Sequence, residues 1–191
     1  MGGNSLSDLL VFGKRAGEHA AEFAKQNEWL NFHEDQIEGA ARTALEPFER
    51  NGGEDANNPY RIQHDLQEMM QQRVGIVRFE ADMAGALDGI HRLHEKASQV
   101  HVVGNREYNP GWHTALDLRH LLTVAEAITR AALERRESRG AHFREDFPAK
   151  DEGLAKTRMV IRKGDDGAMR IERTAVPELP AGLKQIIEEM K

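Results

Sequence analysis

The sequence predicts a mainly α-helical protein: an antiparallel bundle of three to four helices, preceded by one further helix and followed by a β-hairpin segment. Three observations support this class. Apolar residues recur at intervals of three and four over several long stretches, which is the spacing of one buried helix face. The pair Asn58–Pro59 precedes one of these stretches, where a capping residue and a first-turn proline belong. Near the C-terminus, alternating residues flank a Gly/Asp turn, as in a β-hairpin.

The first predicted helix runs from Ser5 to about Gln26, with Asn4 or Ser5 as its N-cap. A second helix begins around residues 33–35 and continues to about Glu49. Pro47 should kink or end this second helix, because proline removes a helix hydrogen bond.

The bundle proper is predicted from three longer apolar stripes. The first follows the Asn58–Pro59 cap and comprises Ile62, Leu66, Met69, Met70, Val74 and Val77. The second starts near Glu80 and comprises Met83, Leu87, Ile90, Leu93 and Ala97. The third runs from Trp112 to about Arg136 and comprises Leu116, Leu118, Leu121, Leu122, Val124, Ala125, Ile128 and Leu133. Short connections between such helices favour an antiparallel bundle.

The C-terminal part changes character after Pro148. Residues 157–162 and 169–174 alternate on either side of a turn rich in Gly and Asp, which predicts a β-hairpin. An isolated hairpin is marginally stable, so this one should pack on another element. A last short helix is expected over residues 183–190.

Composition excludes several classes of function. The chain has 191 residues, 39% hydrophobic and 30% charged, with a net charge of −6, which argues against non-specific binding to nucleic acid. It contains no cysteine, so it forms no disulfide and supplies no thiolate to an iron–sulfur cluster. No apolar run approaches the roughly 20 residues that span a bilayer. A cytoplasmic setting is therefore expected.

Nine histidines raise the question of a metal site. His91 and His94 are spaced to share a helix face, with His101 farther along, but no HExxH pattern or Cys/His cluster accompanies them. His113 and His120 are better interpreted as a capping or packing pair. We therefore assign no metal ligand and no catalytic residue from spacing alone.

The segment around Arg139, His142 and Arg144 follows a basic helix end, and Gly140 is suited to terminate that helix. Together with Glu145 and Asp146, these residues can form a salt-bridged elbow that holds the C-terminal segment to a preceding domain or to a partner subunit. A structural latch and a direct contact with a partner are both open interpretations.

Two long motifs resemble those of a known family. Residues 2–13, GGNSLSDLLVFG, resemble the flavin-contacting segment of the succinate dehydrogenase and fumarate reductase flavoproteins, a family that includes L-aspartate oxidase. Residues 137–148, ESRGAHFREDFP, resemble a stretch near the C-terminus of the same family. Residues 58–70 and 109–113 resemble the helical domain of its bacterial succinate dehydrogenase and fumarate reductase members. The resemblance covers the whole chain, but only about the last third of such a flavoprotein.

The resemblance implies a domain organisation and a cofactor contact. Residues 1–30 would end the FAD-binding domain, residues 31–137 would form the helical bundle, and residues 138–191 would form the elbow, hairpin and short helix. Ser5 and Leu6 would lie against the isoalloxazine ring of FAD. The positive end of their helix would face the pyrimidine side of the flavin, where the reduced ring gains negative charge.

The family's other site residues are missing from this sequence. The substrate-binding arginine before the glycines, the GxGxxG fingerprint and the histidine that carries FAD do not occur here. We therefore expect a shortened expression product, or a naturally short gene product, that alone neither binds FAD tightly nor oxidises succinate.

In the parent complex, the resemblance implies an iron–sulfur subunit and a membrane anchor as partners, with the protein peripheral to the inner face of the membrane. The exposed first helix leaves room for self-association. A free-standing helical interaction or scaffold domain without redox activity is the alternative, and it would bury Leu6, Leu9, Leu10 and Phe12 in its own core.

Overall fold

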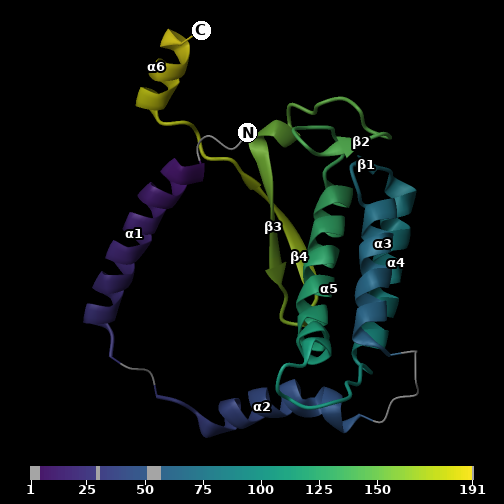
Figure 1. Cartoon of the computed structure of the whole chain (residues 1–191). Coiled ribbons are helices and arrows are strands. Elements are labelled where there is room, and N and C mark those ends of the chain that lie inside the picture. The colour runs from purple at the N-terminus through teal and green to yellow at the C-terminus, as the bar shows by residue number, and fades with distance from the viewer. Residues whose placement is uncertain (1–4, 29–30, 51–56, 191) are drawn as a thin grey trace. The chain divides into compact units, whose positions relative to one another are not determined.

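The computed structural model describes residues 5–28, 31–50 and 57–190 (Figure 1). Residues 2–4 of the predicted flavin-contacting motif lie outside this range. The chain divides into two compact units, Met1–Thr43 and Ala44–Lys191. This division does not test the three domains expected from the sequence, which remain a prediction.

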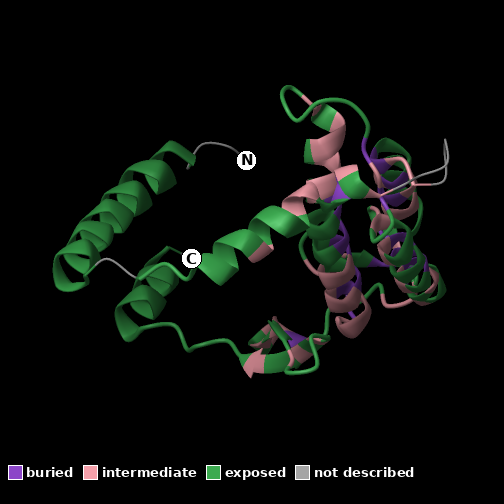
Figure 2. Ribbon diagram, turned by 90° about the horizontal axis from the view of Figure 1, so that it is seen from below, coloured by how far each residue is buried: buried purple, intermediate pink, exposed green. Residues whose placement is uncertain are grey.

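The first unit contains α1 (Ser5–Gln26) and the beginning of α2 (Glu34–Glu49). The bounds of α1 confirm those predicted from its capping and periodicity. None of its residues is buried, and Leu6 is 74% exposed (Figure 2). The apolar face of α1 is therefore free of contact within its own unit.

The last turns of α2 belong to the second unit and pack on the bundle. Pro47 is buried inside the helix, which continues to Glu49. Phe48 meets the ring of Trp112 edge-on, with centroids 5.3 Å apart, and the indole N–H of Trp112 donates to the carbonyl of Ala44 at 2.7 Å. The helix ends two residues beyond Pro47, at the end predicted from the sequence.

Three helices form the body of the second unit: α3 (Pro59–Arg73), α4 (Glu80–Ala97) and α5 (Pro110–Glu134) (Figure 1). The predicted Asn58–Pro59 cap is confirmed: the Asn58 side chain accepts a hydrogen bond from the N–H of Tyr60 at 2.9 Å. A second cap, not predicted, starts α5 at Pro110 instead of Trp112, and there Asn109 accepts a hydrogen bond from the N–H of Trp112 at 3.0 Å. These bonds satisfy backbone donors that have no partner inside the helix.

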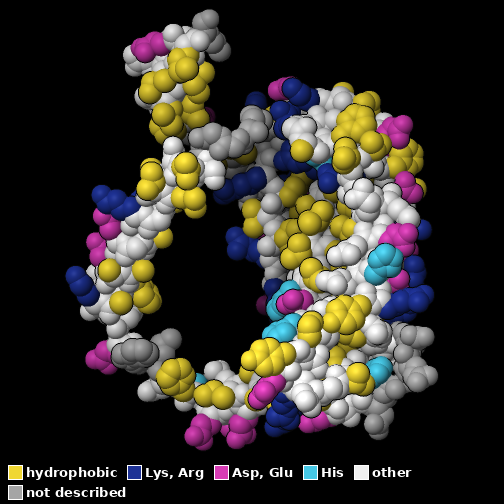
Figure 3. Space-filling view, in the orientation of Figure 1, with side chains coloured by type: hydrophobic (Ala, Val, Ile, Leu, Met, Phe, Trp, Pro, Cys, Tyr) yellow, Lys and Arg dark blue, Asp and Glu magenta, His cyan; other side chains and the backbone are white. Residues whose placement is uncertain are grey.

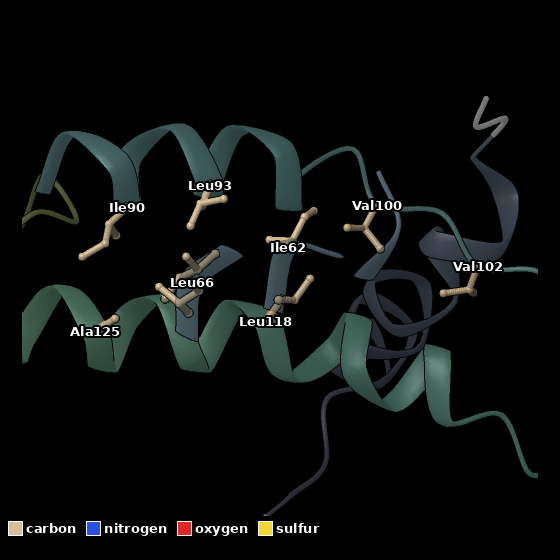
Figure 4. Close-up of a cluster of buried hydrophobic side chains, with 9 residues drawn as sticks. Ile62, Leu66, Ile90, Leu93, Val100, Val102, Leu118 and Ala125 are labelled. Atoms are coloured by element: carbon tan, nitrogen blue, oxygen red, sulfur yellow. The ribbon is translucent and has the colours of Figure 1, made fainter. Parts of the chain in front are cut away.

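The core lies where the predicted stripes of the three helices meet (Figure 4). Its buried side chains are Ile62, Leu66, Ile90, Leu93, Val100, Val102, Leu118, Leu122 and Ala125. A second cluster continues it with Val74, Met83, Ala86 and Ala132. Gly89 allows α3 and α4 to approach closely, because a Cβ there would collide with the sulfur of Met69.

Two details of the predicted stripes are wrong. Val77, placed on the stripe of α3, is 56% exposed and lies in a strand, because the helix ends at Arg73. On α5, Leu121, Val124 and Ile128 are exposed, because α3 and α4 cover only one side of that helix. The mainly α-helical class with a bundle and hairpin is nevertheless confirmed.

The predicted hairpin is formed by β3 (Thr157–Lys163) and β4 (Met169–Ala175). The strands are antiparallel, with Ile161 opposite Ile171, and Gly167 takes a φ of 81° in the turn, which glycine tolerates without strain. Arg173 joins the hairpin to α5 through an ion pair with Glu134 at 2.6 Å. As expected, the hairpin packs on another element.

Smaller elements complete the unit. A single 3-10 turn, η1 (Leu154–Lys156), precedes the hairpin, and α6 (Ala181–Glu189) follows it. A short parallel pair, unforeseen from the sequence, joins β1 (Val77–Arg78), just before α4, to β2 (Phe143–Arg144), after α5. This pair positions the charged segment described next.

Candidate functional site

We call residues 135–147, together with Arg78 and Glu80, the charged elbow. Its shape is set by the turn that the chain makes after the end of α5. Arg135 takes an extended conformation and ends the helix. Gly140 takes a φ of 59°, and the backbones of Arg139 and His142 exchange hydrogen bonds of 2.8 and 3.0 Å. This tight turn sends the chain back toward the beginning of α4.

Arg144 lies at the centre of the elbow and is fully buried. Its Nε and Nη2 each donate to a carboxylate oxygen of Asp146 at 2.7 Å, and Nη2 lies 3.3 Å from Oε2 of Glu80. Its Nη1 donates to the carbonyls of Ala132 at 2.9 Å and Leu133 at 3.3 Å, in the last turn of α5. The buried cation is thus compensated by a bidentate ion pair and by the negative end of a helix.

Asp146 extends this contact to α4. Its Oδ2 accepts a hydrogen bond from the N–H of Glu80 at 2.9 Å, at a helix start where the N-cap residue, Phe79, offers no side-chain cap. The hydrogen bond from Arg144 outweighs the effect of burial and lowers the pKa of Asp146 to about 2. A carboxylate from a distant part of the chain therefore caps α4 in its charged form.

Glu137 forms a second buried centre beside the first. It is 0% exposed, and it receives hydrogen bonds from Arg135, from Arg139 at 3.1 Å and from the N–H of Asp151 at 2.9 Å. Burial alone would raise the pKa of Glu137, but these hydrogen bonds outweigh burial and lower it. Glu137 thus fixes the chain that leads toward the hairpin.

His142 occupies the gap between β1 and the end of α5. Its Nδ1 lies 2.7 Å from Nη1 of Arg78, and its Nε2 lies 3.0 Å from the carbonyl of Arg135. Burial, followed by the nearby arginines, lowers the pKa of His142, against the opposing effect of the Arg135 carbonyl.

The salt-bridged elbow predicted from the sequence is therefore present, and it binds the ends of α4 and α5 in the same unit. Hydrogen bonds to other residues of this chain engage the side chains of Arg139, His142 and Arg144. Glu145 differs from the prediction: its side chain is exposed, and it contributes through its N–H, which donates to the carbonyl of Arg78 at 2.9 Å. The geometry is that of a structural latch.

Sequence reasoning missed Arg78 and Glu80, which belong to the elbow from the other side. Their only sequence signal is a charged pair around Phe79, just before a helix start. Their partners lie 64 to 66 residues away, so no local pattern marks them.

The predicted flavin contacts, Ser5 and Leu6, open the first turn of α1. Both side chains are exposed, so the first turn is accessible, although Asp8 adds a negative charge to it. Contact with FAD stays a prediction.

The histidines considered for metal binding are dispersed. Nε2 of His91 lies 3.9 Å from Glu126, and the same carboxylate acts on the nearby His94, whose pKa is lowered mainly by burial. His113 stacks obliquely beside Trp112, with ring centroids 5.9 Å apart. Within residues 5–28, 31–50 and 57–190, no group of three or more potential ligands is arranged to hold a metal ion.

A cleft of about 410 Å³ lies where α3 and α5 begin. The two Asn–Pro caps line it together with Tyr60, His101, Val102, Val103 and Gly111. The buried Nδ1 of His101 has no hydrogen-bond partner among the described residues.

Among the helices described, none is long and apolar enough to cross a membrane.

Arg144→Met should destabilise the protein strongly, because it leaves the Asp146 carboxylate without its buried partner. We expect the free energy of unfolding, measured with urea, to fall by about 3–5 kcal/mol. The matched control is Arg162→Met, which breaks an exposed pair with Glu172 and should cost about 0–1 kcal/mol. Equal losses in the two variants would contradict the latch.

Acid should weaken the latch through Asp146. Its pKa is lowered from 3.8 to about 2, so its contribution is present above pH 3.8 and is lost as the pH falls toward 2. Linkage then predicts a loss of about 2 kcal/mol across this interval, measurable by urea unfolding at several pH values. Asp146→Asn should remove this component, whereas Asp117→Asn, at an exposed site on α5, should keep it.

Comparison with known proteins places the chain in a family. The family model for the fumarate reductase flavoprotein C-terminus matches residues 63–185. The fumarate reductase flavoprotein subunit of Haemophilus influenzae is 31% identical over 178 residues, covering 92% of this chain and 29% of the relative. The corresponding subunit of Mycobacterium tuberculosis is 32% identical over 176 residues, covering 90% of this chain and 30% of its own length.

Solved structures of the same family resemble this chain as well. Mycobacterium smegmatis Sdh1 is 40% identical with a TM-score of 0.84, covering 100% of this chain and 33% of its own. The quinol fumarate reductase of Escherichia coli is 30% identical with a TM-score of 0.80, covering 92% and 31%. The chain thus spans about a third or less of its relatives' length. It belongs to the fumarate reductase flavoprotein C-terminal family.

Proposed function

We propose that this chain is the C-terminal region of a flavoprotein subunit that interconverts succinate and fumarate. The similarity to fumarate reductase flavoprotein subunits, which extends over 92% of the chain, carries this proposal. A succinate dehydrogenase flavoprotein subunit from Coxiella burnetii is also 31% identical over 154 residues. In the parent protein, FAD would accept or supply the hydride.

The chain's own part in such a site would be one wall. The exposed first turn of α1 carries backbone N–H groups without helical partners and the positive end of the helix dipole. Ser5 and Leu6 would place this turn against the flavin, where fixed dipoles stabilise the charge of the reduced ring. Because the remaining walls would come from the part of the relatives that this chain does not span, the 191 residues alone would be inactive.

The second unit would then serve structure and docking. The buried charged groups of its elbow are bonded to other residues of this chain. This pairing suits a rigid support better than a catalytic centre. An iron–sulfur subunit and a membrane anchor would be partners of the parent protein, which would be cytoplasmic and peripheral to the inner face of the membrane. The names of solved relatives, a quinol fumarate reductase among them, support this assembly.

Activity measurements on two proteins test the proposal. One is the 191-residue chain, and the other is a chimera in which this chain replaces the matched third of the Mycobacterium smegmatis Sdh1 flavoprotein. We expect the chain to be colourless and inactive with succinate and an electron acceptor, and the chimera to bind FAD and reduce the acceptor. A yellow, active chain would contradict its inactivity, and a folded, FAD-bound but inactive chimera would contradict the assigned function.

In the chimera, Leu6→Asp should lower FAD retention about tenfold, because it buries a charge against the ring. Glu22→Gln, near the other end of α1, is the control and should retain FAD. Equal FAD retention in the two variants would remove Leu6 from the flavin contact.

The scaffold alternative requires the apolar side chains of α1 to lie in the chain's own core. Within their own unit these side chains are exposed: Leu6 is 74% exposed, Leu9 67%, Leu10 76% and Phe12 60%. Figure 3 shows hydrophobic side chains along the surface of α1. The helix therefore needs a cover from outside its unit, which we propose is the rest of the parent protein or a second copy of this chain.

Hydrogen exchange over residues 5–25 separates these readings. In dilute monomer we expect rapid exchange, because α1 buries no residue within its own unit. Protection that rises with protein concentration, together with a dimer in sedimentation, would support self-association through α1. Strong protection in dilute monomer would favour the scaffold.

A further inference from the structure

The hydrogen bonds of His142 fix the protonation state of its ring. The guanidinium of Arg78, 2.7 Å from Nδ1, can only donate a hydrogen bond, so Nδ1 must accept. The carbonyl of Arg135, 3.0 Å from Nε2, can only accept, so Nε2 must carry the proton. The elbow therefore holds His142 as the neutral tautomer protonated at Nε2.

The charges that face His142 are all positive. Arg78 approaches from β1, Arg135 from the C-cap of α5, and Arg144 from β2. The elbow's carboxylates are engaged with arginines: Glu80 and Asp146 pair with Arg144, and Glu137 pairs with Arg135 and Arg139. A proton on Nδ1 would add a fourth positive charge without a new acceptor.

His142 also holds more than its own segment. The Nε of Arg78 donates to the carbonyl of Val74 at 3.1 Å, so the Arg78 side chain links the end of α3 to His142. The carbonyl of Arg78 accepts from the N–H of Glu145 at 2.9 Å. If Arg78 moves, the β1–β2 pair loses the side-chain link to the end of α3 and the backbone hydrogen bond to Glu145.

We propose that His142 is a proton-sensitive lock of the elbow: when its ring is neutral it holds Arg78 and the β1–β2 pair together, and when it is protonated it releases them. Protonation removes the acceptor of the Arg78 hydrogen bond and sets imidazolium against three guanidinium groups. The β1–β2 pair then loosens, while Arg144 and Asp146 remain paired and Asp146 still caps α4.

The direction of the pH dependence follows from linkage. Because the pKa of His142 is lowered from 6.5 in the folded protein, the unfolded chain binds the proton more readily. The contribution of the lock is complete above pH 6.5 and is lost as the pH falls below that value. Asp146, with its pKa of about 2, does not titrate in this interval.

Amide hydrogen exchange of Glu145 measures the lock directly. We compare its protection factor, corrected for the intrinsic exchange rate, at about pH 7.5 and about pH 5. We expect protection to fall about tenfold on acidification, as for the loss of one hydrogen bond to a charged group. Unchanged protection would overturn the proposal.

Two substitutions assign the effect to His142. In His142→Asn, the amide oxygen stands near the position of Nδ1 and accepts from Arg78 without titrating, so the ratio of protection at the two pH values should stay near one. His120→Asn, at an exposed position of α5, should keep the tenfold ratio. A tenfold ratio in His142→Asn would overturn the proposal.

If the His142→Asn variant does not fold, a measurement on the unmodified chain still tests the proposal. Nitrogen NMR of the imidazole rings should show His142 protonated at Nε2 and bare at Nδ1 at neutral pH. Its pKa should lie below 6.5. A proton on Nδ1 at neutral pH, or a pKa of His142 at or above 6.5, would overturn the proposal.

Discussion

The buried guanidinium of Arg144 joins two helix ends of opposite polarity. It donates to the last carbonyls of α5 and to Asp146, and Asp146 accepts from the first N–H of α4. Each charge would be costly to bury alone, but each faces the helix end that favours it. Phe147 covers the pair, with its ring centroid 4.9 Å from the guanidinium carbon.

This arrangement determines what the remainder of the second unit can do. The chain after α5 must pass through the elbow to reach η1 and the hairpin, and Glu137 and Ser138 fix its course by further hydrogen bonds. The polar groups of the elbow are thereby directed inward. Such a segment, with its buried charges paired within the chain, is suited to rigid support.

Local features of the sequence were sufficient to predict most of the fold. The bounds of α1 and α4, the Asn58–Pro59 cap and the hairpin depend on residues a few positions apart, and their physical causes operate at that range. Val77 and the outer residues of α5, such as Val124, were misjudged. Periodicity alone does not say at which residue a helix ends, or how much of a helix its neighbours cover.

The site was predictable only on one side. The motif around Arg139, His142 and Arg144 announced a charged elbow, but its partners Arg78 and Glu80 stand 64 to 66 residues earlier. The two-residue strands that bring them together carry no alternation to recognise. The predicted flavin contacts, Ser5 and Leu6, rest on resemblance alone, and the geometry of α1 adds only that its first turn is accessible within its own unit.

The parallel pairing of β1 with β2 also bears on the order in which the protein folds. It closes a loop that contains all of α4 and α5, and closing so long a loop is entropically costly until the enclosed helices have collapsed. The helices and their short connections, by contrast, form contacts between near neighbours in the chain. We therefore expect the bundle to assemble first and the elbow to close over it last, so that burial of Arg144 marks completion of the native state.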